Sequence, residues 1–161
     1  MRETCFHFEL ADEAQTTALA AALAAIAAPG SEIHLVGPLA AGKTAFARGF
    51  LRALGHRGTV KSPTFTIVES YTDLPGDDAA HGPLSVHHFD LYRLADEEEL
   101  DYLGFDDYRQ PDAILLIEWP SRAPGRLTPS IRVELDIGGP EARRAVVSLL
   151  DAESRERAAA F

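Results

Sequence analysis

The pattern of hydrophobic and polar residues along the chain predicts strands interspersed with helices. Alternating or continuous apolar runs predict strands at residues 4–9, 32–37, 64–71, 85–91, 113–117, 131–137 and 145–150. Apolar residues at helical spacing predict helices at residues 12–28, 43–54 and 96–103. Asp12 and Asp96 are placed to cap the first and third helices, and Pro29 and Gly55 to end the first and second. This order predicts an α/β fold with a mainly parallel central sheet, antiparallel strands added at its ends, and helices on both faces.

The remaining segments are predicted to be connections within one domain. Residues 72–84 contain two prolines and two glycines, which predicts a hairpin connection or a mobile flap. Residues 1–150 are expected to form a single domain, since the length suits one hydrophobic core. Residues 151–161 are rich in charge and are expected to form a C-terminal extension, helical or frayed.

The most informative stretch follows the apolar run that ends at Val36. It reads GPLAAGKT, the G-x-x-x-x-G-K-[ST] pattern, and an amphipathic helix follows it. In a strand–loop–helix arrangement, the loop N–H groups and the helix dipole surround a phosphate. A solvated glycine turn is the alternative, but the flanking strand and helix favour a nucleoside triphosphate site. We expect this site to be formed by Gly37, Leu39, Ala40, Ala41, Gly42, Lys43, Thr44 and Ala45. Lys43 is expected to reach the outer phosphates, and the Thr44 hydroxyl to bind Mg²⁺.

Two carboxylates are candidates for the metal and for catalysis. Asp90 and Glu118 each follow an apolar strand, and an open α/β sheet binds its ligand beside such strand ends. Mg²⁺ takes oxygen ligands and keeps several waters, so one or two carboxylates suffice. We expect Glu118 to hold Mg²⁺ directly or through water, and Asp90 to orient the attacking water or join the metal site. The alternative for each is a carboxylate that ends a strand in solvent.

Three further features have both a functional and a structural interpretation. Thr64, in the segment KSPT, is placed to sense a γ-phosphate as a switch residue does, or it simply begins a strand after a proline turn. His87 and His88 are predicted to point to opposite faces of a strand, which argues against a zinc site with His81. Trp119 is expected to be a packed aromatic residue near the site rather than a platform for a base.

Composition narrows the class of protein. The chain has 46% hydrophobic and 25% charged residues, typical of a globular protein. Cys5 is the single cysteine, which predicts a reducing cytoplasmic setting. The longest apolar stretch, residues 18–28, is too short for a membrane span, and acidic residues precede it, so we expect a soluble protein without a signal peptide or membrane contact. The net charge of −10 and the scattered basic residues do not support direct nucleic-acid binding.

Several of these motifs occur together in one known family. The segments GPLAAGKTAFARGFLRALG, VKSPTFTIVESY, HHFDLYRL, EELDYLGFDDY and ILLIEWP, in this order and spacing, resemble the TsaE (formerly YjeE) family of small bacterial P-loop ATPases. The resemblance covers about residues 4–137. It implies a P-loop NTPase fold, Mg²⁺ and ATP as ligands, and a role in threonylcarbamoyladenosine modification of adenosine 37 of tRNAs. It also implies work with the TsaB–TsaD complex, with tRNA involved only indirectly.

The resemblance assigns roles to individual residues. It implies phosphate, metal or catalytic functions for Lys43, Thr44, Thr64, Asp90 and Glu118. It also implies that the start of the first helix, at Asp12 and Glu13, borders the adenine.

Three functions remain open at this point. The first is a slow ATPase that acts as a switch in a tRNA-modification complex, with weak hydrolysis alone because no arginine finger or dedicated base is evident. The second is a small P-loop kinase, although the acidic 72–84 loop lacks the arginines of a typical lid. The third is a non-catalytic module in which ATP only orders an interface. A guanine-specific GTPase is excluded, because the chain has no asparagine for an N-K-x-D motif.

The loop departs from the usual family pattern G-A-G-K-T-T at Ala40 and Ala45. If the backbone at Ala40 has a positive φ, alanine costs on the order of 1–2 kcal/mol there. Ala45 lacks a hydroxyl that would reach the α-phosphate. We therefore predict that a protein with Ala40→Gly and Ala45→Thr binds Mg²⁺-ATP more tightly than the unsubstituted chain. Titration calorimetry measures this, and equal affinity of the two proteins would contradict it.

Overall fold

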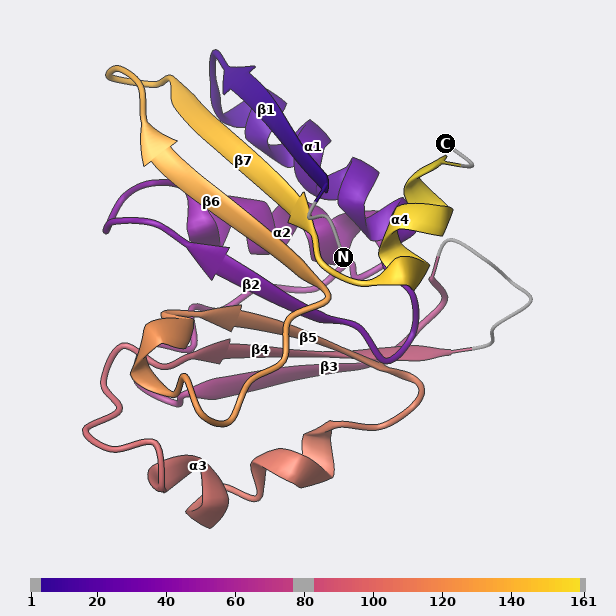
Figure 1. The fold of residues 1–161 in the computed structure, drawn as a ribbon, viewed down its shortest axis with the longest axis vertical. Helices are drawn as coiled ribbons and strands as arrows, with labels where there is room; N and C mark the ends of the chain where they lie inside the picture. Colours follow the sequence, from indigo (N-terminus) through magenta and orange to yellow (C-terminus); the bar gives the residue numbers. More distant parts are fainter. Residues whose placement is uncertain (1–3, 77–82, 160–161) are drawn as a thin grey trace.

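One sheet organises the described part of the chain, residues 4–76 and 83–159 of the computed structural model (Figure 1). Its seven strands have the order β1-β7-β6-β2-β5-β4-β3. In chain order the strands are β1 (Thr4–Leu10), β2 (Glu32–Val36), β3 (Val68–Leu74), β4 (Leu84–Asp90), β5 (Ala113–Glu118), β6 (Ile131–Ile137) and β7 (Arg143–Leu149). The helices are α1 (Glu13–Ile26), α2 (Lys43–Ala53), α3 (Glu99–Tyr102) and α4 (Ala152–Ala159), with 3₁₀ turns η2 (Phe105–Tyr108) and η3 (Pro120–Arg122).

The four central strands, β6, β2, β5 and β4, are parallel to one another. All six residues of β5 are buried, as a parallel strand covered on both faces requires. β7 and β1 extend the sheet in antiparallel pairing on one side, and β3 does so on the other. The predicted fold class, a parallel centre with hairpin strands at the ends, is therefore confirmed.

The parallel pairing gathers the carboxyl ends of the central strands at one edge of the sheet. The phosphate loop, residues 37–44, leaves the end of β2 at this edge. Asp90 and Glu118, the last residues of β4 and β5, are directly opposite each other in the strand register. The turn between β6 and β7, residues 138–142, lies at the same edge because β6 runs parallel to β2. In Figure 1 this is the edge to the left, where the β2 and β5 arrows end.

Helices cover both faces of the sheet. α1 and α2 lie together behind it in Figure 1, and Phe46 and Phe50 of α2 are fully buried in the main core. The second core lies on the opposite face of β4 and β5, where Leu100 of α3 and Phe105 of η2 pack with Phe89. The Phe89 and Phe105 rings meet edge to face with centroids 5.1 Å apart. No helix within residues 4–76 and 83–159 has the length and apolar character needed to cross a membrane.

The predicted charged extension forms helix α4 in its described part, residues 152–159. Arg157 Nε donates a hydrogen bond to the Ile26 carbonyl at the end of α1 (2.8 Å). Ser154 is buried and its hydroxyl donates to the carbonyl of Asp151 (3.0 Å). This helix is therefore docked on the end of α1.

The predicted strand at residues 64–71 begins four residues late. Ile67 has φ +70° and its N–H donates to the Pro63 carbonyl (2.7 Å), which closes a turn ahead of β3. The alternating β-branched residues predicted a strand from Thr64, but the turn keeps residues 64–67 out of the sheet, and β3 begins at Val68. β3 then continues to Leu74 and pairs with β4, so the hairpin interpretation is confirmed, while residues 77–82, with His81, lie outside the described residues.

The predicted helix at residues 96–103 is reduced to the single turn of α3. The N-cap of α3 is Glu98 and not Asp96, whose Oδ1 accepts the N–H of Glu98 (2.9 Å) in the turn that leads into the helix. By contrast, Asp12 caps α1 as predicted, since its side chain accepts the N–H of Gln15 (3.0 Å).

We predict that Gly49→Ala destabilises the protein by about 1–3 kcal/mol, although alanine favours a helix. A Cβ at Gly49 of α2 would lie 3.0 Å from Thr17 Cγ2 and 3.1 Å from the Thr17 carbonyl oxygen, so α1 and α2 would have to separate. Urea denaturation measures the effect. Arg48→Ala, on the exposed side of the same helix, should change stability by less than about 0.5 kcal/mol. Equal stability of Gly49→Ala and the unsubstituted protein would contradict the close helix contact.

Candidate functional site

The phosphate loop folds against β6 through Gly37. A Cβ at this position would lie 2.2 Å from the Leu135 carbonyl oxygen, so the approach of the two strand ends requires glycine. Gly42 has φ +102° and precedes α2, and its carbonyl accepts the N–H of Phe46 (2.9 Å). The sequence pattern thus forms the strand–loop–helix geometry that directs backbone N–H groups into the loop.

Ala40 has a positive φ, so the condition under which alanine is strained at this position is met. Its φ is +67°, and the Ala41 N–H donates to the Pro38 carbonyl (3.2 Å), so Ala40 is the third residue of a tight turn. Positive φ at this turn position favours glycine, and alanine is strained there. The loop therefore has a phosphate-binding shape, but the left-handed conformation of Ala40 raises its free energy.

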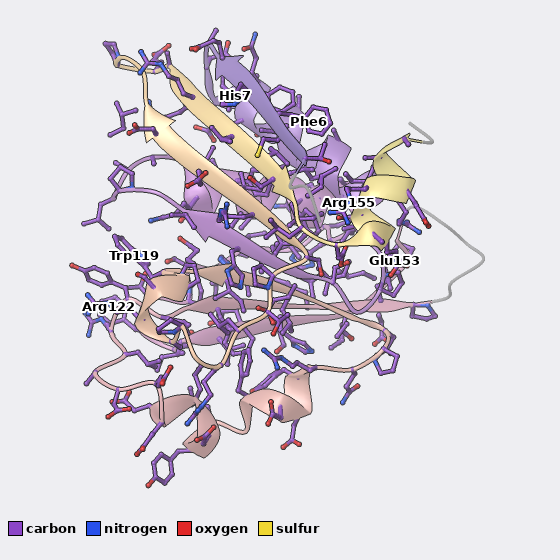
Figure 2. The ribbon with its side chains drawn as sticks, viewed as in Figure 1. Phe6, His7, Trp119, Arg122, Glu153 and Arg155 are labelled. Carbon is purple, nitrogen blue, oxygen red and sulfur yellow. The ribbon has the colours of Figure 1, made fainter. Side chains whose placement is uncertain are left out.

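Lys43 is buried at the centre of the site. Its Nζ donates to the Gly37 carbonyl and lies 4.0 Å from the centroid of the Trp119 ring, a cation–π contact. Burial lowers the Lys43 pKa, while the nearby carboxylates of Glu118 and Asp90 raise it. Trp119 has φ +57° directly after β5, and Figure 2 shows its side chain near Arg122 of η3. The single tryptophan is thus part of the Lys43 environment.

Glu118 is held in place by His88, for which the sequence predicted no role in the site. Glu118 is 4% exposed, and its Oε2 accepts a hydrogen bond from Nε2 of the fully buried His88 (2.7 Å). His87, next along β4, points to the other face and meets the Tyr108 ring at 4.9 Å. The prediction that the two histidines face opposite sides is therefore confirmed.

Thr64 and Asp90 are in direct contact. The Thr64 hydroxyl donates to Asp90 Oδ2 (3.0 Å), and the other carboxylate oxygen, Oδ1, accepts the N–H of Tyr92 (3.0 Å). Ser62 Oγ also lies 2.8 Å from Thr64 Oγ1. The segment ahead of β3 is thus tied to the carboxyl end of β4, on the same face as Lys43.

A pocket of about 470 Å³ adjoins the loop. It lies between the start of α1, the start of α2 and the β6–β7 turn, and its walls include Glu13, Thr16, Gly42, Ala45 and Arg143. Glu13 therefore lies near the loop, while its contact with an adenine stays a prediction. Volumes of this size suit a small organic ligand such as a nucleoside.

The sequence-predicted residues thus lie in two adjoining groups. The pocket contains Glu13, Gly42 and Ala45, and the polar cluster contains Lys43, Thr64, Asp90 and Glu118. Thr44 is the half-buried second residue of α2, whereas Leu39 is 63% exposed on the outside of the loop.

Two residues of the site were missed from the sequence, His88 and Arg143. The spacing of β4 could have placed His88 on the face of Asp90. Arg143 follows the Gly138-Gly139-Pro140 turn. This turn lies beside the loop only because β6 is next to β2 in the sheet, and no nearby residue pattern indicates that position.

The donor set suits a hard cation bound together with phosphate. Within the described residues, no group of three His, Cys, Asp or Glu side chains has the arrangement of a protein-only metal site. The Thr44 hydroxyl and the carboxylates of Asp90 and Glu118 are oxygen donors, and Mg²⁺ commonly uses one or two such groups with waters and phosphate oxygens. The chemistry of these residues therefore fits Mg²⁺.

The fold and this loop define the class of P-loop α/β proteins. The crystal structure of Bacillus subtilis YdiB has a similar fold, with a TM-score of 0.79, 26% identity, and coverage of 99% of this chain and 95% of that chain. A family model described as "Threonylcarbamoyl adenosine biosynthesis protein TsaE" matches residues 10–146, and the chain belongs to this family.

Curated relatives carry the same description, tRNA threonylcarbamoyladenosine biosynthesis protein TsaE. The Haemophilus influenzae protein is 48% identical over 59% of this chain and 55% of its own length. The Bacillus subtilis protein is 43% identical over 65% of this chain and 60% of its own length. Both matches therefore span less than two thirds of the relative's length. The Synechocystis protein is 38% identical over 77% of this chain and 76% of its own length.

We predict that Glu118→Gln lowers the Lys43 pKa. The Glu118 carboxylate raises this pKa against the effect of burial, so loss of its charge leaves burial less opposed. The measurement is the pH dependence of Lys43 acylation, read by mass spectrometry, with exposed Lys61 as the internal reference. The midpoint for Lys43 should move to lower pH and that for Lys61 should not. Glu153→Gln, on α4, is the matched control. An unchanged Lys43 midpoint in Glu118→Gln would contradict the coupling.

Proposed function

We propose that this protein binds Mg²⁺-ATP and hydrolyses it slowly, in the service of threonylcarbamoyladenosine formation on tRNA in the cytoplasm. The observation that carries the proposal is the convergence of Lys43, Asp90 and Glu118 on a loop with phosphate-binding geometry. Membership of the TsaE family supports the tRNA-modification role. The absence of an N-K-x-D motif supports adenine over guanine.

In the proposed complex, the loop N–H groups and Lys43 bind the phosphates. Lys43 exchanges the Gly37 carbonyl and the Trp119 ring for phosphate oxygens, which bind an ammonium more strongly. Thr44, Glu118 and Asp90 would hold Mg²⁺, which would supply positive charge beside the phosphates. Bound to Glu118, His88 fixes the direction of that carboxylate. The adenosine occupies the 470 Å³ pocket beside Glu13.

Asp90 and Thr64 are proposed to respond to the γ-phosphate. The Asp90 carboxylate is restrained at both oxygens by Thr64 and Tyr92, so it is oriented before a nucleotide binds. A water held by Asp90 would be positioned for attack, and the Thr64 hydroxyl would sense the phosphate. Loss of the phosphate on hydrolysis would then alter the 62–66 segment, as in nucleotide-dependent switches.

The surface beside residues 62–66, the switch segment, supports the proposal that the TsaB–TsaD complex docks near the site. Phe65 is 79% exposed and Tyr92 39% exposed. The Arg93 guanidinium lies 4.2 Å from the Phe65 ring centroid, and Arg122 lies 5.5 Å from that of Tyr92. Exposed aromatic residues with stacked arginines are typical of protein interfaces. A partner that binds here would reach the switch segment directly.

We predict that Mg²⁺-ATP binding requires Lys43, and that phosphate release rises when TsaB–TsaD is added. The experiment titrates the protein and Lys43→Ala with Mg²⁺-ATP, and measures phosphate release with and without the complex. Lys43→Ala should lose at least about tenfold in affinity, since a charge-assisted contact to phosphate is removed.

The outcomes separate the candidate functions. Tight binding without release in either condition would contradict the ATPase and favour a module that ATP only orders. Release that is unchanged by TsaB–TsaD would contradict the switch within a complex. Absence of binding would mean that the strained loop does not accept a nucleotide.

A further inference from the structure

Arg143 joins the phosphate loop to the β6–β7 turn. Its Nη1 donates to the Ala142 carbonyl (2.8 Å) and lies 3.4 Å from the Gly139 carbonyl oxygen, both in the turn. Its Nη2 donates to the carbonyl of Ala40 (3.1 Å), 103 residues away in the sequence. One planar guanidinium therefore connects three backbone carbonyls of two segments.

The bonded carbonyl belongs to the strained residue of the loop. Ala40 has φ +67° and is exposed, so packing of its side chain does not maintain this conformation. Its neighbour Ala41 is fully buried, and the turn that it closes with Pro38 depends on the orientation of the Ala40 peptide. A hydrogen bond to the Ala40 carbonyl acts directly on that orientation.

We propose that Arg143 is a positioning residue of the phosphate loop, which holds Ala40 in its left-handed conformation. The loop N–H groups then face the phosphates before the nucleotide arrives, and less ordering is required on binding. This inference rests on the proposed nucleotide site. Lysine cannot replace arginine, because a single ammonium does not reproduce the planar fork that spans the turn and the loop.

The competing explanation is a direct contact between Arg143 and the nucleotide, since the side chain also lines the 470 Å³ pocket. The two explanations differ in how they depend on residue 40. Glycine adopts positive φ without strain, so a positioning residue becomes dispensable when Ala40 is replaced by glycine. A direct contact keeps its full effect in that background.

A double-mutant cycle on the full chain tests the proposal. Mg²⁺-ATP affinity is measured for the unsubstituted protein, Arg143→Ala, Ala40→Gly and the double variant. Arg143→Ala should weaken binding about tenfold, the scale of left-handed strain on alanine. In the Ala40→Gly background, the same substitution should weaken it about twofold or less.

The chain offers a matched control at the next position. Arg144 carries the same charge, but its Nε lies 3.7 Å from Glu9 on the opposite face of the sheet. Arg144→Ala should leave ATP affinity unchanged, which separates loop positioning from the loss of one positive charge. Arg143→Lys should bind ATP as weakly as Arg143→Ala.

A second readout needs no nucleotide. Amide hydrogen exchange at Ala41 should be about tenfold faster in Arg143→Ala, because its bond to the Pro38 carbonyl depends on the loop conformation. Equal losses of affinity in the two backgrounds would overturn the proposal, and so would unchanged exchange at Ala41. If the unsubstituted chain fails to bind ATP, the proposed function fails, and exchange at Ala41 still decides the role of Arg143.

Discussion

Parallel hydrogen bonding of β2 to both β5 and β6 is the constraint on which the site depends. It brings the loop after β2, Glu118 at the end of β5 and the turn after β6 to one edge. β4 joins the same edge in register, which sets Asp90 opposite Glu118. Because successive residues of a strand alternate between faces, a shift of β5 by one residue would direct Glu118 to the other face, away from Lys43. The polar chemistry of the site is therefore a consequence of strand register.

The site combines several groups that would each be unfavourable elsewhere in the fold. A lysine is buried, a glutamate is buried beside a histidine, and an alanine and a tryptophan have left-handed backbones. The surrounding structure compensates the buried lysine: Glu118 and Asp90 oppose the effect of burial on the Lys43 pKa, and Trp119 provides an aromatic face for the ammonium. Strain and buried charge that gather at one place are typical of functional sites. Elsewhere, the described core is composed largely of aliphatic and aromatic side chains, apart from the buried Glu32–His34 pair of β2.

The sequence was sufficient where the determining interactions are local. Periodicity identified all the strands of the sheet, and the loop motif, with its flanking strand and helix, identified Lys43. Asp90 and Glu118 could be predicted because they end apolar strands. The predicted start of β3 was wrong because Ile67 has a left-handed backbone conformation, which its β-branched side chain disfavours. The hydrogen bond from Ile67 to the Pro63 carbonyl explains this conformation. Arg143 escaped prediction for a different reason, since its bond to Ala40 depends on the strand order of the complete sheet.

The close approach of α1 and α2 at Gly49 has a mechanical consequence. At Gly49 the two helices approach too closely for even a methyl group to fit beside Thr17, which favours their movement as a pair. We therefore expect the start of α1, with Glu13, to move together with the start of α2 and the loop. The opposite wall of the pocket is formed by Pro140 and Glu141 of the β6–β7 turn and by Arg143 at the start of β7. Because Arg143 hydrogen-bonds both this turn and the Ala40 carbonyl of the loop, widening of the pocket would require this connection to move or break.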